Sequence, residues 1–85
     1  MTTQENILAE LEKVTGTDEV YKNLDLALFE EQILDSLGTV ELIVSLGDMF
    51  HLDLTPGMVD RKMWATPRKI IDDIEARIKT QAIKK

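Results

Sequence analysis

The sequence predicts an all-α bundle of three main helices and one short helix, with a long first loop. Two observations support this fold class: apolar residues recur at helical spacing in three separate segments, and the signals of β-strands are missing. The chain has 85 residues, of which 44% are hydrophobic, and its two prolines and four glycines leave no place for a flexible linker. Because a chain of this size supports one core, residues 1–85 are expected to form a single domain.

The first helix is expected over residues 4–14. Thr2 or Thr3 can cap its N-terminus, Glu5 lies in its first turn, and Gly16 follows its last turn. Four apolar residues at helical spacing mark its core face: Ile7, Leu8, Leu11 and Val14.

The long first loop follows, over residues 15–35, and shows no convincing periodicity. A loop of about 20 residues is uncommon in a compact domain. This loop is rich in apolar residues, so it is expected to pack on the bundle, with a turn of helix near residues 28–31. The apolar residues are Leu24, Leu26, Leu28, Phe29, Ile33 and Leu34.

The second main helix is expected over residues 37–50. Ser36 is its predicted N-cap, because a serine hydroxyl can accept a hydrogen bond from an unpaired backbone N–H of the first turn. At about 100° per residue, the apolar side chains of this helix fall into two arcs. The wider arc is an ordinary core face and contains Leu42, Ile43, Leu46, Met49 and Phe50.

The second arc lies on the opposite side of this helix. It contains Leu37, Val40 and Val44, and Glu41 and Asp48 lie immediately beside them. One helix cannot turn both arcs toward a single core in a domain of this size. Either the long loop covers the second arc, or the arc is an exposed apolar stripe edged by acids, which is the usual composition of a docking surface.

A short helix is expected between residues 51 and 65. Met58, Met63 and Trp64 are expected to lean on the core from this segment, with Trp64 as a structural anchor rather than a ligand contact.

The last helix begins at Thr66 and Pro67, a capping residue followed by proline at the first helical position. Arg77 and Lys79 near its end suit the negative end of the helix dipole. Its apolar stripe is Ile70, Ile71, Ile74 and Ile78.

The net charge of −6 is unevenly distributed. Residues 1–36 hold nine acids and two bases, residues 37–60 hold four acids and no base, and residues 61–85 hold three acids and eight bases. An acidic body repels phosphate backbones and attracts basic protein surfaces, so no nucleic-acid partner is expected. The alternative interpretation is that the acidity only aids solubility.

The residue inventory does not favour an enzyme that acts alone. There is no cysteine, and the one histidine, His51, lies about 22 Å from Ser36 along a helix that rises 1.5 Å per residue. No Ser-His pair, no set of residues at metal-ligand spacing and no glycine-rich phosphate loop is present, so neither a catalytic nor a metal site is predicted. The polar start and the absence of a long apolar run favour a cytoplasmic protein.

The segment Ile33-Leu34-Asp35-Ser36-Leu37-Gly38-Thr39-Val40-Glu41-Leu42 resembles the phosphopantetheine attachment motif of acyl carrier proteins. The chain length, the helix layout and the long first loop are similar as well, so the resemblance covers nearly the whole chain. It implies an acyl carrier protein-like bundle in which Ser36 carries a covalent 4′-phosphopantetheine arm.

Two further features resemble one branch of these carriers, the D-alanyl carrier proteins of Gram-positive teichoic acid modification. One is Gly38, where fatty-acid carriers usually place an acid. The other is the segment Asp60-Arg61-Lys62-Met63-Trp64-Ala65-Thr66-Pro67-Arg68-Lys69-Ile70, which is similar to a signature of that branch. The only acids on the second helix, Glu41 and Asp48, are fewer than in fatty-acid carriers.

The resemblance implies a monomeric carrier that performs no bond chemistry itself. Its expected partners are a phosphopantetheinyl transferase, a D-alanine:carrier protein ligase and a membrane-bound acyltransferase system that uses the D-alanyl thioester for lipoteichoic acid. Asp35 would help the transferase to recognise or orient Ser36. The docking surface would consist of Leu37, Val40, Glu41 and Val44, with Asp48 at its edge.

Two alternatives remain open from the sequence. The chain could be an acyl or peptidyl carrier of another pathway, such as fatty acid, polyketide or non-ribosomal peptide synthesis, because only Gly38 and the Trp-Thr-Pro segment argue against this. It could also be a helical adaptor that binds a partner through the second arc and leaves Ser36 unmodified.

Overall fold

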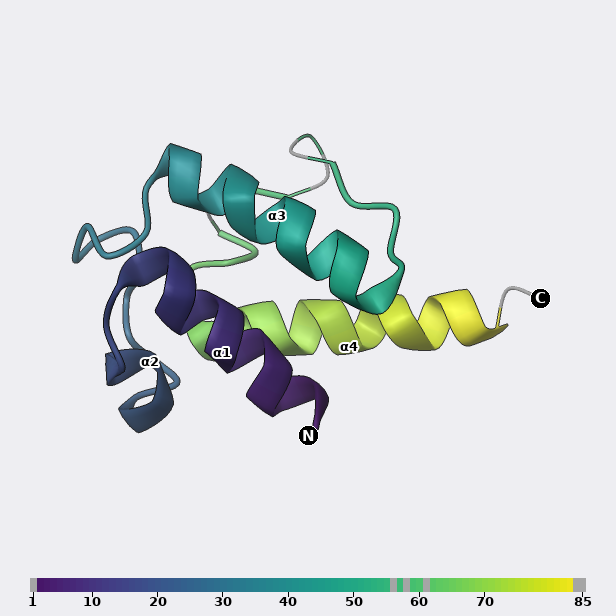
Figure 1. Ribbon diagram of the computed structural model, residues 1–85, viewed down its shortest axis with the longest axis horizontal. Helices are drawn as coiled ribbons and strands as arrows, with labels where there is room; N and C mark the ends of the chain where they lie inside the picture. Colours follow the sequence, from purple (N-terminus) through teal and green to yellow (C-terminus); the bar gives the residue numbers. More distant parts are fainter. Residues whose placement is uncertain (1, 56, 58, 61, 84–85) are drawn as a thin grey trace.

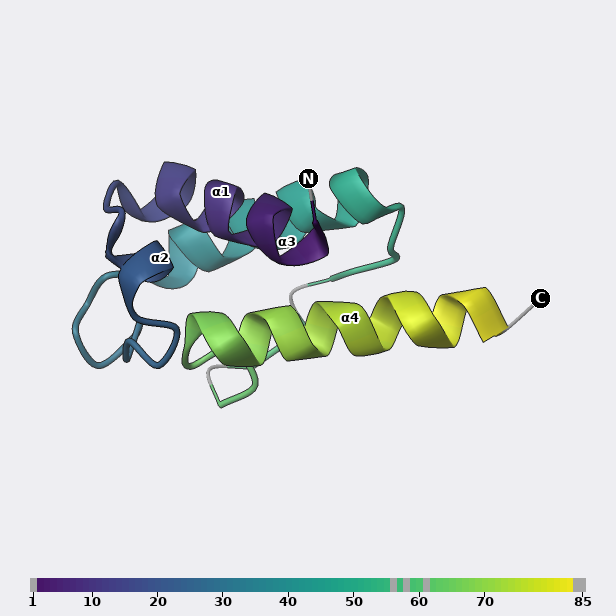
Figure 2. The same cartoon turned by 90° about the horizontal axis from the view of Figure 1, so that it is seen from below.

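The computed structural model describes residues 2–55, 57, 59–60 and 62–83, with side chains up to residue 80. Helices α1 and α3 lie side by side in one layer, α4 lies in a second layer, and α2 lies at one end of the bundle (Figure 1, Figure 2). This arrangement confirms the predicted all-α fold class. The α-helices of the described residues are α1 (Thr3–Thr15), α2 (Glu19–Lys22), α3 (Ser36–Phe50) and α4 (Pro67–Ile83).

The core lies between the two layers, and α1 contacts each of the other three helices. The predicted apolar faces of α1 and α4 supply much of it, and each fully buried aliphatic side chain contributes roughly 1.5–3 kcal/mol to the hydrophobic free energy of folding. The buried apolar residues are Ile7, Leu8, Leu11, Val20, Leu28, Leu34, Leu42, Ile43, Leu46, Trp64, Ile70, Ile71 and Ile74.

The ends of α1 follow from its capping residues. The Oγ1 atom of Thr2 accepts a hydrogen bond from the backbone N–H of Glu5, and the Glu5 carboxylate accepts one from the backbone N–H of Thr2, both at 3.1 Å. The hydrogen bond from the Thr2 backbone lowers the pKa of Glu5. At the other end Gly16 adopts the left-handed conformation with φ of 76°, which ends the helix. Thr2 is therefore the cap, and α1 extends one residue beyond the predicted range at each end.

A short helix, α2, lies in the first loop, where Val20 is buried and where no helix was predicted. A short helix was predicted between residues 51 and 65, and part of that segment lies outside the described residues. Its described residues form no α-helix, and Gly57 has the 3-10 conformation. The short helix in this segment therefore stays a prediction.

The chain makes a turn before α4. The carboxylate and backbone oxygens of Asp60 accept hydrogen bonds from the backbone N–H groups of Met63 and Trp64, at 2.8 and 3.3 Å. Trp64 is fully buried, as expected of an anchor. Met63 is exposed, so its predicted core contact is wrong, because the turn that buries Trp64 leaves its neighbour outside. Met58, the other predicted core methionine, lies outside the described residues.

The first loop is packed on the bundle, as predicted, and is tied to the start of α4. The backbone N–H of Arg68 donates to the oxygen of Leu24, and that of Leu28 donates to the oxygen of Ala65, both at 2.9 Å. The Arg68 guanidinium also donates to the Asp25 carboxylate, at 2.9 Å, and this hydrogen bond lowers the pKa of Asp25.

The expected turn of helix near residues 28–31 corresponds to hydrogen-bonded turns over residues 28–32. They do not extend into a helix, because Gln32 adopts a positive φ of 59°.

Helix α3 turns three of the five residues of its wider arc fully into the core: Leu42, Ile43 and Leu46. Phe50 packs against the core with partial burial. Met49 is 39% exposed, which corrects its predicted core position. It lies at the edge of the arc and in the last turn, immediately before the chain leaves the helix at His51. No helix in the described part of the chain is long and apolar enough to cross a membrane.

Candidate functional site

Asp35 and Ser36 form the start of α3. The Oδ1 atom of Asp35 accepts a hydrogen bond from the backbone N–H of Gly38 at 2.7 Å, so Asp35 is the N-cap. Ser36 is the first residue of the helix, and the prediction of Ser36 as the N-cap is therefore wrong by one residue. The physical reason is that the Asp35 carboxylate reaches the backbone N–H of Gly38 in the first turn. It also carries a negative charge, which the positive end of a helix dipole stabilises.

Gly38 allows close packing around this helix start. It is buried, and a Cβ atom added here would lie 3.1 Å from side-chain carbons of Leu34 and Val14 and 3.2 Å from the Asp35 carboxylate. A larger residue would therefore press on both the core and the capping carboxylate. Glycine at this position lets the end of α1 and the first loop meet the start of α3.

Ser36 is exposed and lines two hollows. The first, which we call the Ser36 groove, has a volume of about 310 Å³. Its lining residues are Phe29, Ser36, Thr39, Val40, Ile43, Val59 and Asp60. The second hollow lies on the loop side of Ser36 and is lined by Phe29, Gln32, Leu34, Asp35 and Ser36.

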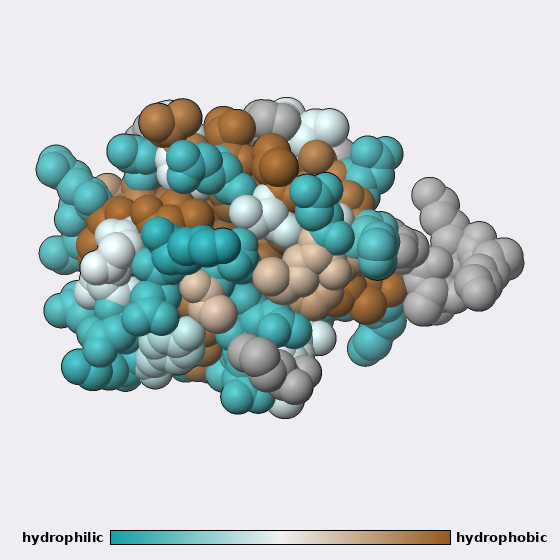
Figure 3. Space-filling view, in the orientation of Figure 1, coloured by the Kyte–Doolittle hydropathy of each residue, from teal (hydrophilic) through white to brown (hydrophobic). Residues whose placement is uncertain are grey.

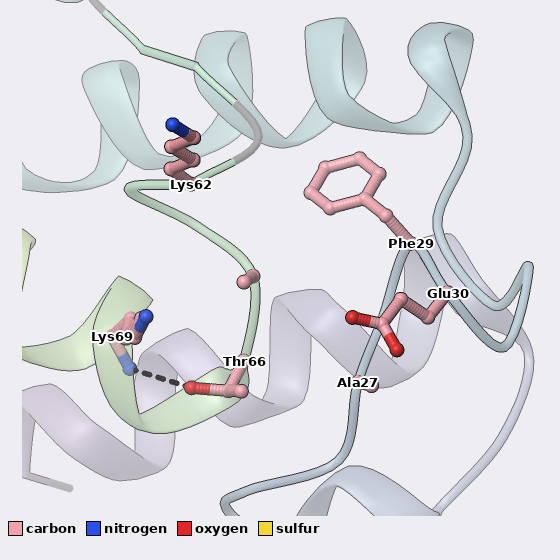
Figure 4. A pocket seen from close by; sticks show the side chains of 7 residues that line it. Ala27, Phe29, Glu30, Lys62, Thr66 and Lys69 are labelled. Atoms are coloured by element: carbon pink, nitrogen blue, oxygen red, sulfur yellow. Dashed lines mark hydrogen bonds between the residues drawn. The ribbon is translucent and has the colours of Figure 1, made fainter.

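A third hollow, which we call the lysine hollow, has a volume of about 530 Å³. Phe29 and Glu30 enter it from the first loop, while Lys62 and Lys69 come from the segment that leads into α4 and from its first turn (Figure 4). Thr66 accepts a hydrogen bond from the backbone N–H of Lys69 at 3.2 Å, which caps α4 as predicted. Phe29 lines all three hollows, so they adjoin at this side chain.

The second arc of α3 is exposed. Leu37 is 70% exposed, Val40 40% and Val44 58%, so the first loop does not cover them. Figure 3 shows apolar side chains gathered along the edge of the molecule that α3 forms in Figure 1. Glu41 and Asp48 are exposed beside this apolar stripe of Leu37, Val40 and Val44. The structure thus confirms an exposed stripe edged by acids, and it begins beside Ser36.

Comparison with known proteins gives relatives over most of this chain. A D-alanyl carrier protein of Enterococcus faecalis is 46% identical over 76 residues, which are 89% of this chain and 97% of that protein. One of Lacticaseibacillus rhamnosus is 51% identical over 70 residues, covering 82% of this chain and 83% of that protein. One of Listeria monocytogenes is 41% identical over 76 residues, again 89% and 97% of the two chains.

The chain belongs to the D-alanyl carrier protein family. No protein-family model matches it. In this family member all of the predicted site residues are exposed, and they lie along α3 or at its cap. They are Asp35, Ser36, Leu37, Val40, Glu41, Val44 and Asp48. His51 lies at the opposite end of α3 from Ser36, as its C-cap. The described residues contain no group of three or more His, Asp or Glu side chains that could hold a metal ion.

Sequence reasoning missed three residues around Ser36 in this D-alanyl carrier protein family member. Phe29, Val59 and Asp60 line the Ser36 groove, and they come from the segments that precede and follow α3. No local pattern shows that these two segments meet. The one available signal was the apolar character of the first loop, which predicted that Phe29 packs on the bundle.

Asp35 is expected to contribute to the stability of the fold. Replacing Asp35 with alanine removes the cap of α3 and should lower the free energy of unfolding by about 1 kcal/mol, whereas Asp35→Asn keeps a capping oxygen and should cost much less. Urea denaturation followed by circular dichroism measures both changes. An Asp35→Ala variant as stable as the unaltered protein would show that the 2.7 Å hydrogen bond does not hold the helix start.

Proposed function

We propose that this carrier protein holds D-alanine as a thioester on a 4′-phosphopantetheine arm attached to Ser36, and that it delivers D-alanine for the D-alanylation of lipoteichoic acid. One observation supports this above others: an exposed serine in an Asp-Ser-Leu sequence begins α3 in a chain that belongs to the D-alanyl carrier protein family. In this proposal residues 1–85 act as one monomeric domain. The chain presents the cargo and leaves the bond chemistry to its partners.

The surroundings of Ser36 fit an attached phosphodiester. Ser36 occupies the first position of a 15-residue helix, where backbone N–H groups and the positive end of the dipole favour a negative charge. Ser36 is exposed and lines the Ser36 groove, so an attached arm can extend into solvent or along this groove. Because the chain has no cysteine, the attached arm supplies the thiol on which an acyl group is held.

The attachment needs no base from this chain. A phosphopantetheinyl transferase joins the Ser36 oxygen to the phosphorus that bears the pantetheine arm in coenzyme A, and the bond from that phosphorus to the nucleotide half breaks. The serine proton passes to the transferase. Asp35 next to Ser36 is engaged as the helix cap at 2.7 Å, which favours a role in holding the serine in place rather than in taking its proton.

The apolar stripe supplies the docking surface in this proposal. Leu37, Val40 and Val44 offer partners an apolar centre, and Glu41 and Asp48 offer a charged edge. Apolar centres with polar rims are typical of protein interfaces, and rim charges act mainly on the rate of association. The transferase, the D-alanine:carrier protein ligase and the membrane-bound acyltransferase system are the proposed partners.

A polar substitution in the stripe should separate docking from folding. Val40→Thr keeps the size of a side chain that is 40% exposed, so the free energy of unfolding should change by about 0.5 kcal/mol or less. The value of kcat/KM for D-alanine loading by the ligase should fall about five- to thirty-fold, because a polar group at an interface centre must lose its water. Stopped-flow or quench-flow loading assays measure this change.

Ala76→Ser is the matched control, because it adds a hydroxyl at an exposed position of α4, away from the stripe. It should load at the unaltered rate. A Val40→Thr protein that unfolds readily, yet is loaded and discharged normally at low temperature, would show that the stripe serves the core rather than a partner.

The proposed function is tested by loading the purified protein in two steps. Intact mass is measured after treatment with a transferase and coenzyme A, and again after incubation with ATP, D-alanine and the ligase. Controls omit D-alanine or replace it with a fatty acid and an acyl carrier ligase. The proposal fails if no arm is attached, as an adaptor would show, or if the arm accepts a fatty acyl group but not D-alanine.

A further inference from the structure

The Ser36 groove has a charge pattern of its own. Among the described residues that line it, Asp60 is the only charged one, and the others are apolar or hydroxyl-bearing: Phe29, Ser36, Thr39, Val40, Ile43 and Val59. The lysine hollow, which Phe29 also lines, contains Lys62 and Lys69 against Glu30 alone. A cation in the Ser36 groove therefore meets one carboxylate, whereas the lysine hollow has a net positive lining.

We propose that the Ser36 groove is a resting site for the loaded end of the arm, and that the Asp60 carboxylate binds the ammonium group of the D-alanyl thioester there. The inference rests on the proposed function and names a residue that recognises the cargo on the carrier itself. The ligand class is an α-amino acyl thioester, whose free ammonium distinguishes it from a fatty acyl or other uncharged group.

Asp60 is held in place by the local turn. Its Oδ1 atom accepts a hydrogen bond from the backbone N–H of Met63 at 2.8 Å, and its backbone oxygen accepts one from the fully buried Trp64 at 3.3 Å. A carboxylate has two oxygens and can accept further hydrogen bonds, so this turn orients the group without using its whole capacity. Asp35 also accepts one backbone hydrogen bond, from Gly38, but it lines the hollow on the loop side of Ser36 and not the Ser36 groove.

Because the arm is tethered to Ser36, a weak ion pair is enough to hold its loaded end at Asp60. Ser36 and Asp60 line the same hollow of about 310 Å³, so an arm attached to Ser36 brings its end near Asp60 when it folds back into this hollow. A flexible tether of this kind gives the ammonium group an effective concentration of roughly millimolar at the carboxylate. An exposed ion pair is then partly populated, whereas the same two groups on separate molecules would rarely pair. The apolar walls Phe29, Ile43 and Val59 accept the uncharged part of a folded arm.

The test compares two arms that differ only by the ammonium group. A transferase attaches D-alanyl-amino-pantetheine or propionyl-amino-pantetheine, each joined through a stable amide in place of the thioester, from the matching coenzyme A analogues. Intact mass first confirms attachment to Ser36. Proton–nitrogen correlation spectra of each loaded protein then report the backbone amides of the groove.

The D-alanyl arm should shift the amides of Val59, Asp60 and Met63 by at least twice as much as the propionyl arm does. Asp60→Asn should reduce this difference at least threefold, because the amide oxygen still accepts the Met63 hydrogen bond while the charge is lost. Asp53→Asn removes an exposed carboxylate that neither lines the groove nor belongs to the docking surface, and it should leave the difference unchanged.

Three results would overturn the inference. Equal shifts from both arms, or a difference that persists in Asp60→Asn, would show that the groove does not recognise the ammonium group, while attachment itself leaves the proposed function standing. A chain that takes up neither arm at Ser36 overturns the inference and the proposed function together. A D-alanyl-specific shift that disappears in Asp60→Asn alone supports the inference.

Discussion

Replacing Ser36 with alanine is expected to abolish loading completely. The variant has no hydroxyl to accept the arm, so its intact mass should stay unchanged after treatment with a transferase and coenzyme A. It should then accept no D-alanine from the ligase. The effect is all-or-none because the chain has no cysteine that could hold an acyl group in place of the arm.

The chain offers a matched control for this experiment. It contains two serines, and the second, Ser45, lies within α3 and is half-buried. Ser45→Ala should be modified and loaded as the unaltered protein is. A thiol-specific reagent gives a second readout, because every thiol in the treated protein must come from the arm. A thiol that appears in Ser36→Ala would place the attachment elsewhere and overturn the proposal.

The stability of Ser36→Ala checks the assignment of the helix cap. Loss of an N-cap costs about 1 kcal/mol, whereas an exposed substitution at the first helical position usually changes stability by less than about 0.5 kcal/mol. Because Asp35 supplies the cap, we expect the smaller change. A loss near 1 kcal/mol would mean that Ser36 shares the capping of α3.

The sequence alone predicted those features that depend on neighbouring residues. The ends of α1 follow from Thr2, Glu5 and Gly16, and the start of α4 follows from Thr66 and Pro67, because each cap forms within one turn. The exposed stripe was one of two alternatives on a helical wheel. The wheel shows which side chains share a face, but it does not show whether a loop covers that face.

The errors arise where a position has two chemically reasonable solutions. Asp35 and Ser36 are both good capping residues, and only the observed backbone shows that Asp35 takes the role. The short helix of the first loop was not predicted, because its four residues are too few for a periodic pattern, and only the structure shows that Val20 is buried there. The Ser36 groove was not predictable, because Phe29 and Asp60 meet only when the first loop is tied to α4 through Arg68, Leu28 and neighbouring backbone groups.

The largest loss of stability is expected from Trp64. This residue is fully buried, and its indole N–H donates a hydrogen bond to the Asp73 carboxylate at 2.9 Å. Arg77 donates to the same oxygen at 2.9 Å, so Asp73 links the turn before α4 to the helix itself. Trp64→Ala removes the largest buried side chain of the domain and should lower the free energy of unfolding by about 3–5 kcal/mol.

That loss is large for this chain, because native domains have only about 0.05–0.15 kcal/mol of stability per residue. Trp64→Ala should therefore unfold at much lower urea concentration, which far-UV circular dichroism can follow although the chain then has no tryptophan. Trp64→Phe is the matched variant: it keeps an aromatic ring in the core but loses the bond to Asp73, so it should cost clearly less than alanine. Trp64 does not line the hollows around Ser36, so Trp64→Phe should still be loaded with D-alanine at the unaltered rate. An unchanged unfolding midpoint for Trp64→Ala combined with impaired loading would instead make Trp64 a contact for the arm or a partner.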